Sequence, residues 1–217
     1  MAVDFEAARA RMVAEQIEAR GFHDEAVLEA MRRVPRHLFV DPTLRERAYE
    51  DTPLPIGEQQ TISQPYMVAL MSEALELRGG ERVLEVGTGS GYQAAVLAEL
   101  GARVLSLERV PALAERARAR LTALGYAECV RVEVADGTLG WAPEAPYEAI
   151  VVTAGAPQLP RPLIEQLARG GRLVLPMGED ELQTLVRIRR GPEGLSEEYL
   201  GECRFVKLLG SYGWEEP

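Results

Sequence analysis

The chain contains no asparagine, one lysine (Lys207), two cysteines and two histidines. So few cysteines and histidines argue against a zinc or disulfide framework, because such sites need several ligands at defined spacing. Cys129 and Cys203 lie in segments expected to be strands, where we expect buried, unpaired thiols. His23 and His37 are expected to satisfy local hydrogen bonds rather than to act in catalysis. We therefore predict no metal site.

The charge balance is acidic, with a formal net charge of −10 at pH 7 and a sequence pI of about 4.9. A nucleic-acid-binding protein normally presents a basic face, and the one basic cluster here, residues 187–190, alternates like a strand. No apolar run approaches the roughly 20 residues that span a bilayer. The N-terminus carries early acids and no apolar signal segment. We expect a cytoplasmic monomer with no nucleic-acid or membrane partner.

Residues 81–98, E-R-V-L-E-V-G-T-G-S-G-Y-Q-A-A-V-L-A, are the segment around which the chain is organised. They predict a buried strand, a turn with three glycines, and a helix that begins near Tyr92. Glycine lets the backbone approach a ligand closely, and the N–H groups at the helix start face that ligand. The turn residues expected to bind it are Gly87, Thr88 and Gly89.

Two acids indicate what the ligand is. Glu85 stands just before the turn, where a carboxylate repels phosphates but attracts an ammonium or sulfonium group. Glu108 ends the next predicted strand, about 20 residues on, at the distance where an acid holds a ribose diol. Tyr92 stands where the dinucleotide fingerprint has its third glycine. S-adenosylmethionine fits these features, and the alternative is an ordinary strand-to-helix turn with two solvated acids.

Strands and helices alternate from Glu81 onwards, which implies an α/β fold with a mainly parallel sheet and right-handed crossovers. Two further strands are expected in the tail, one over the 187–190 cluster and one around residues 203–209. We predict one domain over residues 1–217. Its first part, 1–78, would hold N-terminal helices and a substrate-side loop, and 79–217 would form the cofactor-binding core.

A long proline-punctuated connection, residues 50–66, precedes this core. Loops of this length inside a compact domain are often functional. Thr61, Ser63 and Gln64 offer polar side chains, and Pro65 is expected in the first turn of the next helix. The alternative role for Ser63 is that of a simple helix N-cap.

The order of these motifs resembles the class I S-adenosylmethionine-dependent methyltransferases: E-V-G-T-G-S-G, then an acid ending the next strand, then D-G, then Y-E-A-I-V-V, then G-G-R-L-V. The resemblance implies a Rossmann-like, seven-stranded sheet with helices on both faces, and S-adenosyl-L-homocysteine as a product. It also implies that Glu85 lies near the methionine end of the cofactor and that Glu108 holds the ribose hydroxyls. Asp136 would lie at the adenine amino group, and Gly137 would allow close approach of the ring.

A narrower resemblance, from about Met12 to Trp214, is to the protein-L-isoaspartate O-methyltransferases. It rests on G-E-Q-Q-T-I-S-Q-P-Y-M-V-A, V-P-R-H-L-F-V and D-G-T-L-G-W. It implies methyl transfer to the α-carboxyl of L-isoaspartyl residues in damaged peptides and proteins. Ser63 matches the marked active-site serine of that family, with Thr61, Ile62 and Gln64 lining the same cleft. Lys207 departs from the pattern, which usually has proline there.

Three other functions compete with this hypothesis. The first is a methyltransferase for a small metabolite or another protein side chain, which the T-I-S-Q-P-Y block disfavours. The second is a nicotinamide-dependent oxidoreductase, which Tyr92 and Glu85 disfavour. The third is a non-catalytic cofactor-binding module, which an intact substrate-side loop disfavours.

Overall fold

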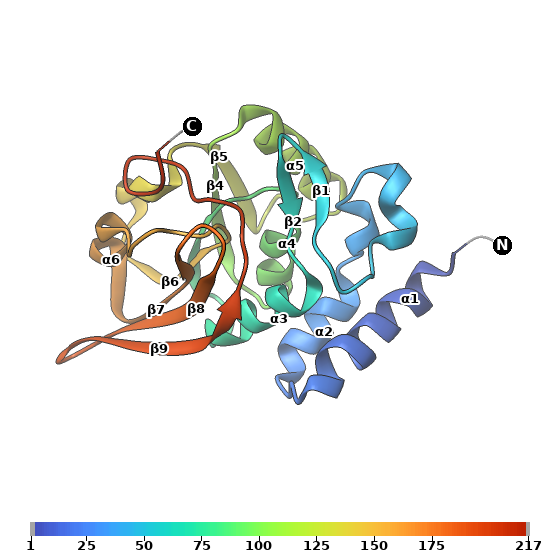
Figure 1. Ribbon diagram of the computed structural model, residues 1–217, viewed down its shortest axis with the longest axis horizontal. Helices are drawn as coiled ribbons and strands as arrows, with labels where there is room; N and C mark the ends of the chain where they lie inside the picture. The colour runs from blue at the N-terminus through green and yellow to red at the C-terminus, as the bar shows by residue number, and fades with distance from the viewer. Residues whose placement is uncertain (1–2, 216–217) are drawn as a thin grey trace.

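The computed structural model describes residues 3–215, and one seven-stranded sheet forms its centre (Figure 1). The strand order is β5-β4-β3-β6-β7-β8-β9, parallel from β5 to β7 and antiparallel from β7 to β9. The strands are β3 (Arg82–Val86), β4 (Arg103–Glu108), β5 (Val130–Val134), β6 (Tyr147–Val152), β7 (Leu167–Gly178), β8 (Gln183–Gly191) and β9 (Gly194–Cys203). The predicted fold class is confirmed.

Helices cover both faces of this sheet. They are α1 (Phe5–Arg11), α2 (Glu25–Arg33), α3 (Pro65–Ala74), α4 (Tyr92–Glu99), α5 (Pro111–Ala123) and α6 (Arg161–Gln166). One core cluster joins the sheet face that carries Val83 to α2, α3 and α4, and a second joins the opposite face to α6. Figure 1 shows α1 and α2 at one end of the molecule and α6 at the other. No helix within residues 3–215 is long and apolar enough to cross a membrane.

The N-terminal segment is less regular than one predicted helix. After α1 the backbone continues as a π-helix, Met12–Ile17, and a 3-10 turn, Glu18–Arg20, which ends at Gly21 with φ +84°. Three short 3-10 helices, Arg36–Leu38, Pro42–Arg47 and Gly137–Leu139, lie in the loops, and a fourth covers Ala142–Glu144.

The connection before α3 contains a hairpin that the sequence did not predict. Strands β1 (Leu54–Gly57) and β2 (Gln60–Ile62) pair antiparallel. The turn between them places Glu58 and Gln59 at φ +52° and +58°. Such turns usually use Asn or Gly, so the Glu-Gln pair gave no turn signal. The hairpin holds residues 60–62 in a fixed, extended conformation immediately before Ser63.

The expectation of a strand around residues 203–209 was wrong, and so was the expectation that both cysteines are buried. The last strand ends at Cys203, and residues 204–215 continue as an irregular tail with isolated bridges instead of a strand over 203–209. Cys129 lies before β5 and is exposed, while Cys203 is half-buried. Both thiols are free.

The parallel topology determines where a ligand binds. The chain runs from β3 to β4 and β5 on one side, and β6 then returns to the other side of β3. The carboxyl ends of β3 and β6 therefore flank the switch point, where a crevice is expected.

Candidate active site

A cleft that is partly open to solvent lies at this switch point. Its walls come from the hairpin, the glycine turn, the end of β4, the end of β6 and the C-terminal tail. The residues that line it are Gln60, Thr61, Ile62, Ser63, Val68, Val86, Gly87, Thr88, Gly89, Ser90, Tyr92, Gln93, Leu107, Glu108, Arg109, Val110, Gly137, Thr153, Ala154, Val206, Lys207, Leu208 and Leu209. Eight of the ten predicted site residues are in this set, and Glu85 and Asp136 are not.

The glycine turn after β3 is fixed by backbone bonds to β4. The N–H groups of Gly87 and Thr88 both donate to the carbonyl of Leu107, at 2.8 and 3.2 Å. Gly87 has φ +98°, and a Cβ atom there would lie 2.5 Å from Thr153 Oγ1. The Thr153 hydroxyl donates to the Gly87 carbonyl at 2.6 Å. A side chain at position 87 would therefore displace the Thr153 hydroxyl from its bond to the Gly87 carbonyl and would add the strain of a positive φ.

Replacing Gly87 with alanine is expected to cost about 1–3 kcal/mol of stability, from strained backbone and the clash with Thr153. The matched control is Gly125→Ala, since Gly125 has φ +85° but no atom within 4 Å of the place that a Cβ would take. Thermal unfolding should show a larger loss for Gly87→Ala, and only that variant should lose affinity for S-adenosyl-L-homocysteine. Equal losses of stability in both variants would contradict the clash.

Glu108 presents its carboxylate at the end of β4, with 6% of the residue exposed. Oε2 accepts a hydrogen bond from Gly89 N at 2.8 Å, and Oε1 accepts one from Val110 N at 3.0 Å. Each carboxylate oxygen has a second lone pair available. The side chain is thus fixed by two backbone amides while it can still accept hydrogen bonds from a diol in the cleft.

Gly137 and Asp136 follow β5 and differ in their relation to the cleft. Gly137 lines the cleft, and a Cβ atom there would overlap Val86 Cγ1. Asp136 Oδ1 accepts from Thr138 N at 2.9 Å, and Oδ2 accepts from Ser211 N at 2.8 Å. Burial opposes ionisation of Asp136, but these hydrogen bonds from Ser211 and Thr138 lower its pKa. Its carboxylate lies in an adjoining hollow, where it anchors the tail.

Glu85 lies inside the sheet layer instead of facing the ligand. It is fully buried, and Oε2 is hydrogen-bonded to the Ser106 hydroxyl on β4, which donates when the carboxyl is ionised. Burial raises the pKa of Glu85 to about 8; the Ser106 hydrogen bond opposes this shift and the nearby Glu108 charge adds to it. The carboxyl is therefore mostly neutral at pH 7. This differs from the expectation of a carboxylate that attracts a positive ligand directly.

The hairpin brings Ser63 and its neighbours to the cleft. Ile62 is 3% exposed and packs in the core, Thr61 is exposed, and Ser63 is half-buried. Gln64, which was also expected in the cleft, is not among the residues that line it. It is the N-cap of α3 and makes no side-chain capping bond, and Pro65 occupies the first turn. The alternative role of Ser63 as a helix cap is therefore wrong.

Contacts to α5 and to the glycine turn fix the hairpin in place. Arg116 of α5 donates to the Ile56 carbonyl at 3.3 Å, and its Nη1 lies 3.8 Å from Glu58 Oε1. A Cβ on Gly89 would lie 3.4 Å from Ile56 Cδ1, so the hairpin packs against the turn. The two halves of the site, distant in sequence, thus form one cleft.

The tail forms a wall of the cleft that sequence reasoning missed. Gly155 N donates to the Val206 carbonyl at 2.7 Å, and Leu208 N donates to the Gly155 carbonyl at 2.8 Å. Lys207 pairs with Asp180 at 2.8 Å, and its Nζ lies 5.3 Å from the centre of the Trp214 ring. These contacts join residues far apart in sequence, so no local pattern could have indicated them. Ser90, Tyr92 and Gln93 were likewise not predicted to line the site.

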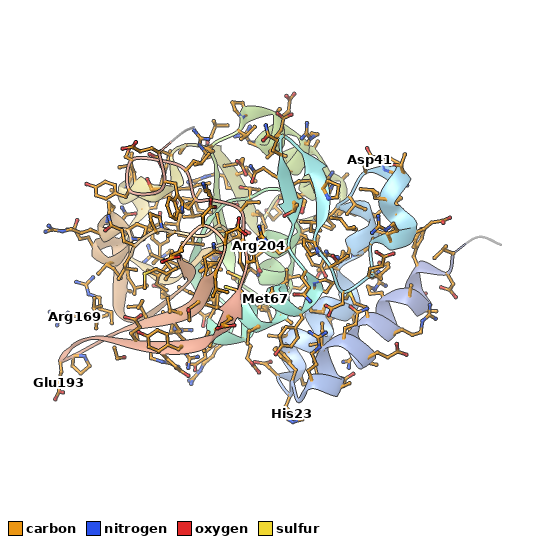
Figure 2. All side chains as sticks on the ribbon, viewed as in Figure 1. His23, Asp41, Met67, Arg169, Glu193 and Arg204 are labelled. Atoms are coloured by element: carbon orange, nitrogen blue, oxygen red, sulfur yellow. The ribbon has the colours of Figure 1, made fainter. Side chains whose placement is uncertain are left out.

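Neither histidine lines the cleft. His37 stacks on Phe5, with ring centres 4.1 Å apart, and its Nδ1 is 2.7 Å from the Tyr49 hydroxyl. His23 is exposed, and Figure 2 shows it at the outer edge of the N-terminal helices. Within residues 3–215 no group of three or more His, Cys, Asp or Glu side chains could hold a metal ion. His37 makes the local hydrogen bond that was predicted for it.

The cleft fits S-adenosylmethionine. The glycine turn and Gly137 line the cleft without side chains of their own, and Glu108 supplies a fixed carboxylate for a ribose diol. Apolar walls from Ile62, Leu107 and others suit an adenine ring and a methionine chain.

Comparison with known proteins agrees with this geometry. The family model for protein-L-isoaspartate(D-aspartate) O-methyltransferase matches residues 7–213. The chain is 61% identical over 213 residues to protein-L-isoaspartate O-methyltransferase 1 of Syntrophobacter fumaroxidans, covering 98% of this chain and 99% of that protein.

Two solved structures share the fold over nearly the whole chain. One, a protein-L-isoaspartate O-methyltransferase, has a TM-score of 0.83 and 31% identity, and the match covers 94% of this chain and 67% of that one. The other, from Plasmodium falciparum, is described as such an enzyme in complex with S-adenosyl-L-homocysteine. Its TM-score is 0.82 and its identity 28%, and the match covers 93% of this chain and 98% of that one. The chain therefore belongs to the protein-L-isoaspartate(D-aspartate) O-methyltransferase family.

Proposed function

We propose that this protein transfers a methyl group from S-adenosylmethionine to the α-carboxyl of L-isoaspartyl residues in damaged proteins and peptides. The observation that carries the proposal is the single cleft that joins the hairpin, with Ser63, to the glycine turn. The following backbone nitrogen then displaces methanol from the ester and closes a succinimide. Hydrolysis of that ring returns part of the chain to the L-aspartyl linkage.

The acceptor needs no general base. A carboxyl with a pKa near 4 is already ionised at pH 7. When bound, S-adenosylmethionine supplies the methyl group as an electrophile. The protein's task is to hold the acceptor oxygen in line and to exclude water from it. The absence of a histidine from the cleft lining is consistent with this requirement.

The roles of the site residues follow from their positions. Ser63 orients the acceptor carboxylate at the cleft wall and is no nucleophile, since neither histidine lines the cleft to activate it. Glu108 binds the ribose hydroxyls, and the backbone of residues 87–89 contacts the methionine part of the cofactor. Gly137 admits the adenine ring, with Asp136 beside it. Thr61 and Ile62 close the cleft over the cofactor.

The two sequence segments act as one domain. The core cluster that contains Val83 also contains Met12, Met31 and Met71, which supports a shared core for residues 1–78 and 79–217. A monomeric state and a cytoplasmic location stay predictions from the sequence.

Two synthetic peptides test the function directly. They are identical and C-terminally amidated, except that one carries L-isoaspartate and the other L-aspartate. Labelled methyl groups should pass to the isoaspartyl peptide at a rate on the order of a hundredfold higher, because the aspartyl carboxylate is displaced from the aligned position. The label should be base-labile, as a methyl ester is. Cofactor binding without labelling of either peptide would contradict the proposed acceptor.

A further inference from the structure

A buried chain of three polar side chains runs from the sheet interior to the cleft. Glu85 on β3 and Ser106 on β4 are each fully buried and occupy paired positions in the parallel register. Ser106 Oγ bonds to Glu85 Oε2, and it lies 2.5 Å from Thr88 Oγ1. Thr88 is 3% exposed and lines the cleft within the glycine turn.

The hydrogen-bond directions in this chain are coupled, because each hydroxyl carries one hydrogen. If Glu85 is protonated, it donates to Ser106, Ser106 donates to Thr88, and the Thr88 hydrogen is left for the cleft. If Glu85 is ionised, it must accept from Ser106, which then accepts from Thr88. The Thr88 oxygen in that state presents only lone pairs to the cleft.

We propose that Glu85, acting through Ser106, is a positioning residue that makes the Thr88 hydroxyl a hydrogen-bond donor to an oxygen of the bound cofactor. The geometry favours the protonated direction. Glu85 Oε1 is buried and, within residues 3–215, has no hydrogen-bond partner, which is far costlier for an ionised carboxylate than for a neutral acid. Burial accordingly holds the carboxyl pKa at about 8.

The charged groups around Glu85 do not reverse the preference for its protonated form. From β4, Glu108 disfavours ionisation. From β6, the paired residue is the apolar Val151. On the same face of the sheet, α3 and α4 contribute the acids Glu73 and Glu99 and the phenols of Tyr66 and Tyr92.

Arg36 is fully buried, with its guanidinium 4.9 Å from the centre of the Tyr92 ring. Helix α5 carries further charges on this face, and Arg120 is the one attached to the glycine turn. Its Nη1 donates to the Ser90 carbonyl at 2.6 Å, and its guanidinium lies over the Phe39 ring. Arg116 is bound at the hairpin, Arg118 donates to the Val132 carbonyl at 2.9 Å, and Glu115 is exposed. The charge that shifts the pKa of Glu85 is therefore the negative charge of Glu108, which raises it.

The test measures the dissociation constant of S-adenosyl-L-homocysteine by calorimetry at about pH 6.5 and about pH 9, on either side of the Glu85 pKa. Wild type is compared with Glu85→Gln, whose amide donates to Ser106 at both pH values. The wild-type constant should rise about tenfold more than that of Glu85→Gln, as expected for one lost hydrogen bond. Titration of the ligand's own amine is common to both proteins and cancels in this ratio.

Ser106→Ala provides the second arm and serves if Glu85→Gln does not fold. Removal of the Ser106 hydroxyl disconnects Thr88 from Glu85, so the affinity of this variant should lack the extra pH dependence. Identical pH profiles in wild type and the variants would overturn the proposal. The inference rests on the proposed function only for the identity of the ligand. Failure of wild type to bind S-adenosyl-L-homocysteine at pH 6.5 would count against the proposed cofactor. Binding without the extra pH dependence would count against the link from Glu85 through Ser106 to Thr88.

Discussion

Replacing Glu108 with glutamine is expected to raise the dissociation constant of S-adenosyl-L-homocysteine on the order of a hundredfold. The carboxylate accepts hydrogen bonds from Gly89 N and Val110 N and keeps lone pairs for two ribose hydroxyls. A glutamine has one carbonyl oxygen, so its NH₂ group must oppose one of the two backbone donors. Hydrogen bonds to a charged acceptor contribute about 1.5–3 kcal/mol each, and the two to the diol would be weakened together.

Calorimetry on the folded variant measures this effect, with Glu133→Gln as the matched control. Glu133 lies on the neighbouring strand β5, loses the same charge and is absent from the cleft lining. Its variant should bind the ligand as wild type does. Turnover of Glu108→Gln at saturating cofactor should stay within a fewfold of wild type, because the interaction is made equally before and during methyl transfer. Unchanged affinity in Glu108→Gln would remove Glu108 from the ribose site.

The glycine turn and Glu108 were predictable because their geometry is local. Strand, turn and helix follow each other within residues 81–98, and the parallel pairing of β3 with β4 places Glu108 beside Gly89. The family resemblance was also confirmed, since the family model matches residues 7–213. It could be seen in the sequence because its most specific block, T-I-S-Q-P-Y, is short and contiguous.

The orientation of Glu85 could not be predicted from spacing. Side chains alternate along a strand, so two adjacent positions near its end face different surroundings. Val86 lines the cleft, whereas Glu85 points into the layer with Ser106. Proximity in sequence to a ligand-binding turn therefore did not decide whether the charge would face the ligand or be neutralised by burial.

The hairpin and the tail depended on contacts that sequence patterns do not encode. The hairpin turn uses non-glycine residues with positive φ, held by the packing of Ile56 against Gly89 and by Arg116. The tail wall depends on the pairing of residues 206–208 with Gly155, some fifty positions earlier in the chain. Together these elements add two walls to the crevice at the carboxyl ends of β3 and β6.

Replacing Ser63 with alanine is expected to lower kcat for methylation of an isoaspartyl peptide on the order of a hundredfold. Ser63 follows β2, is half-buried and lines the cleft. Loss of its hydroxyl removes the group that aligns the acceptor carboxylate, and small misplacements of reacting atoms have effects of this size. The affinity for S-adenosyl-L-homocysteine should change little, because Glu108 and the turn remain.

The fold should not suffer, since Ser63 is not the N-cap of α3 and that cap makes no side-chain bond. The melting temperature of Ser63→Ala should therefore match that of Ser196→Ala, an exposed substitution on β9 outside the cleft lining. Ser63→Thr retains a hydroxyl and should recover part of the lost turnover, which a purely steric role for the serine would not give. Near-wild-type kcat in Ser63→Ala would instead assign acceptor alignment to the backbone of the hairpin, with the side chain contributing only to packing.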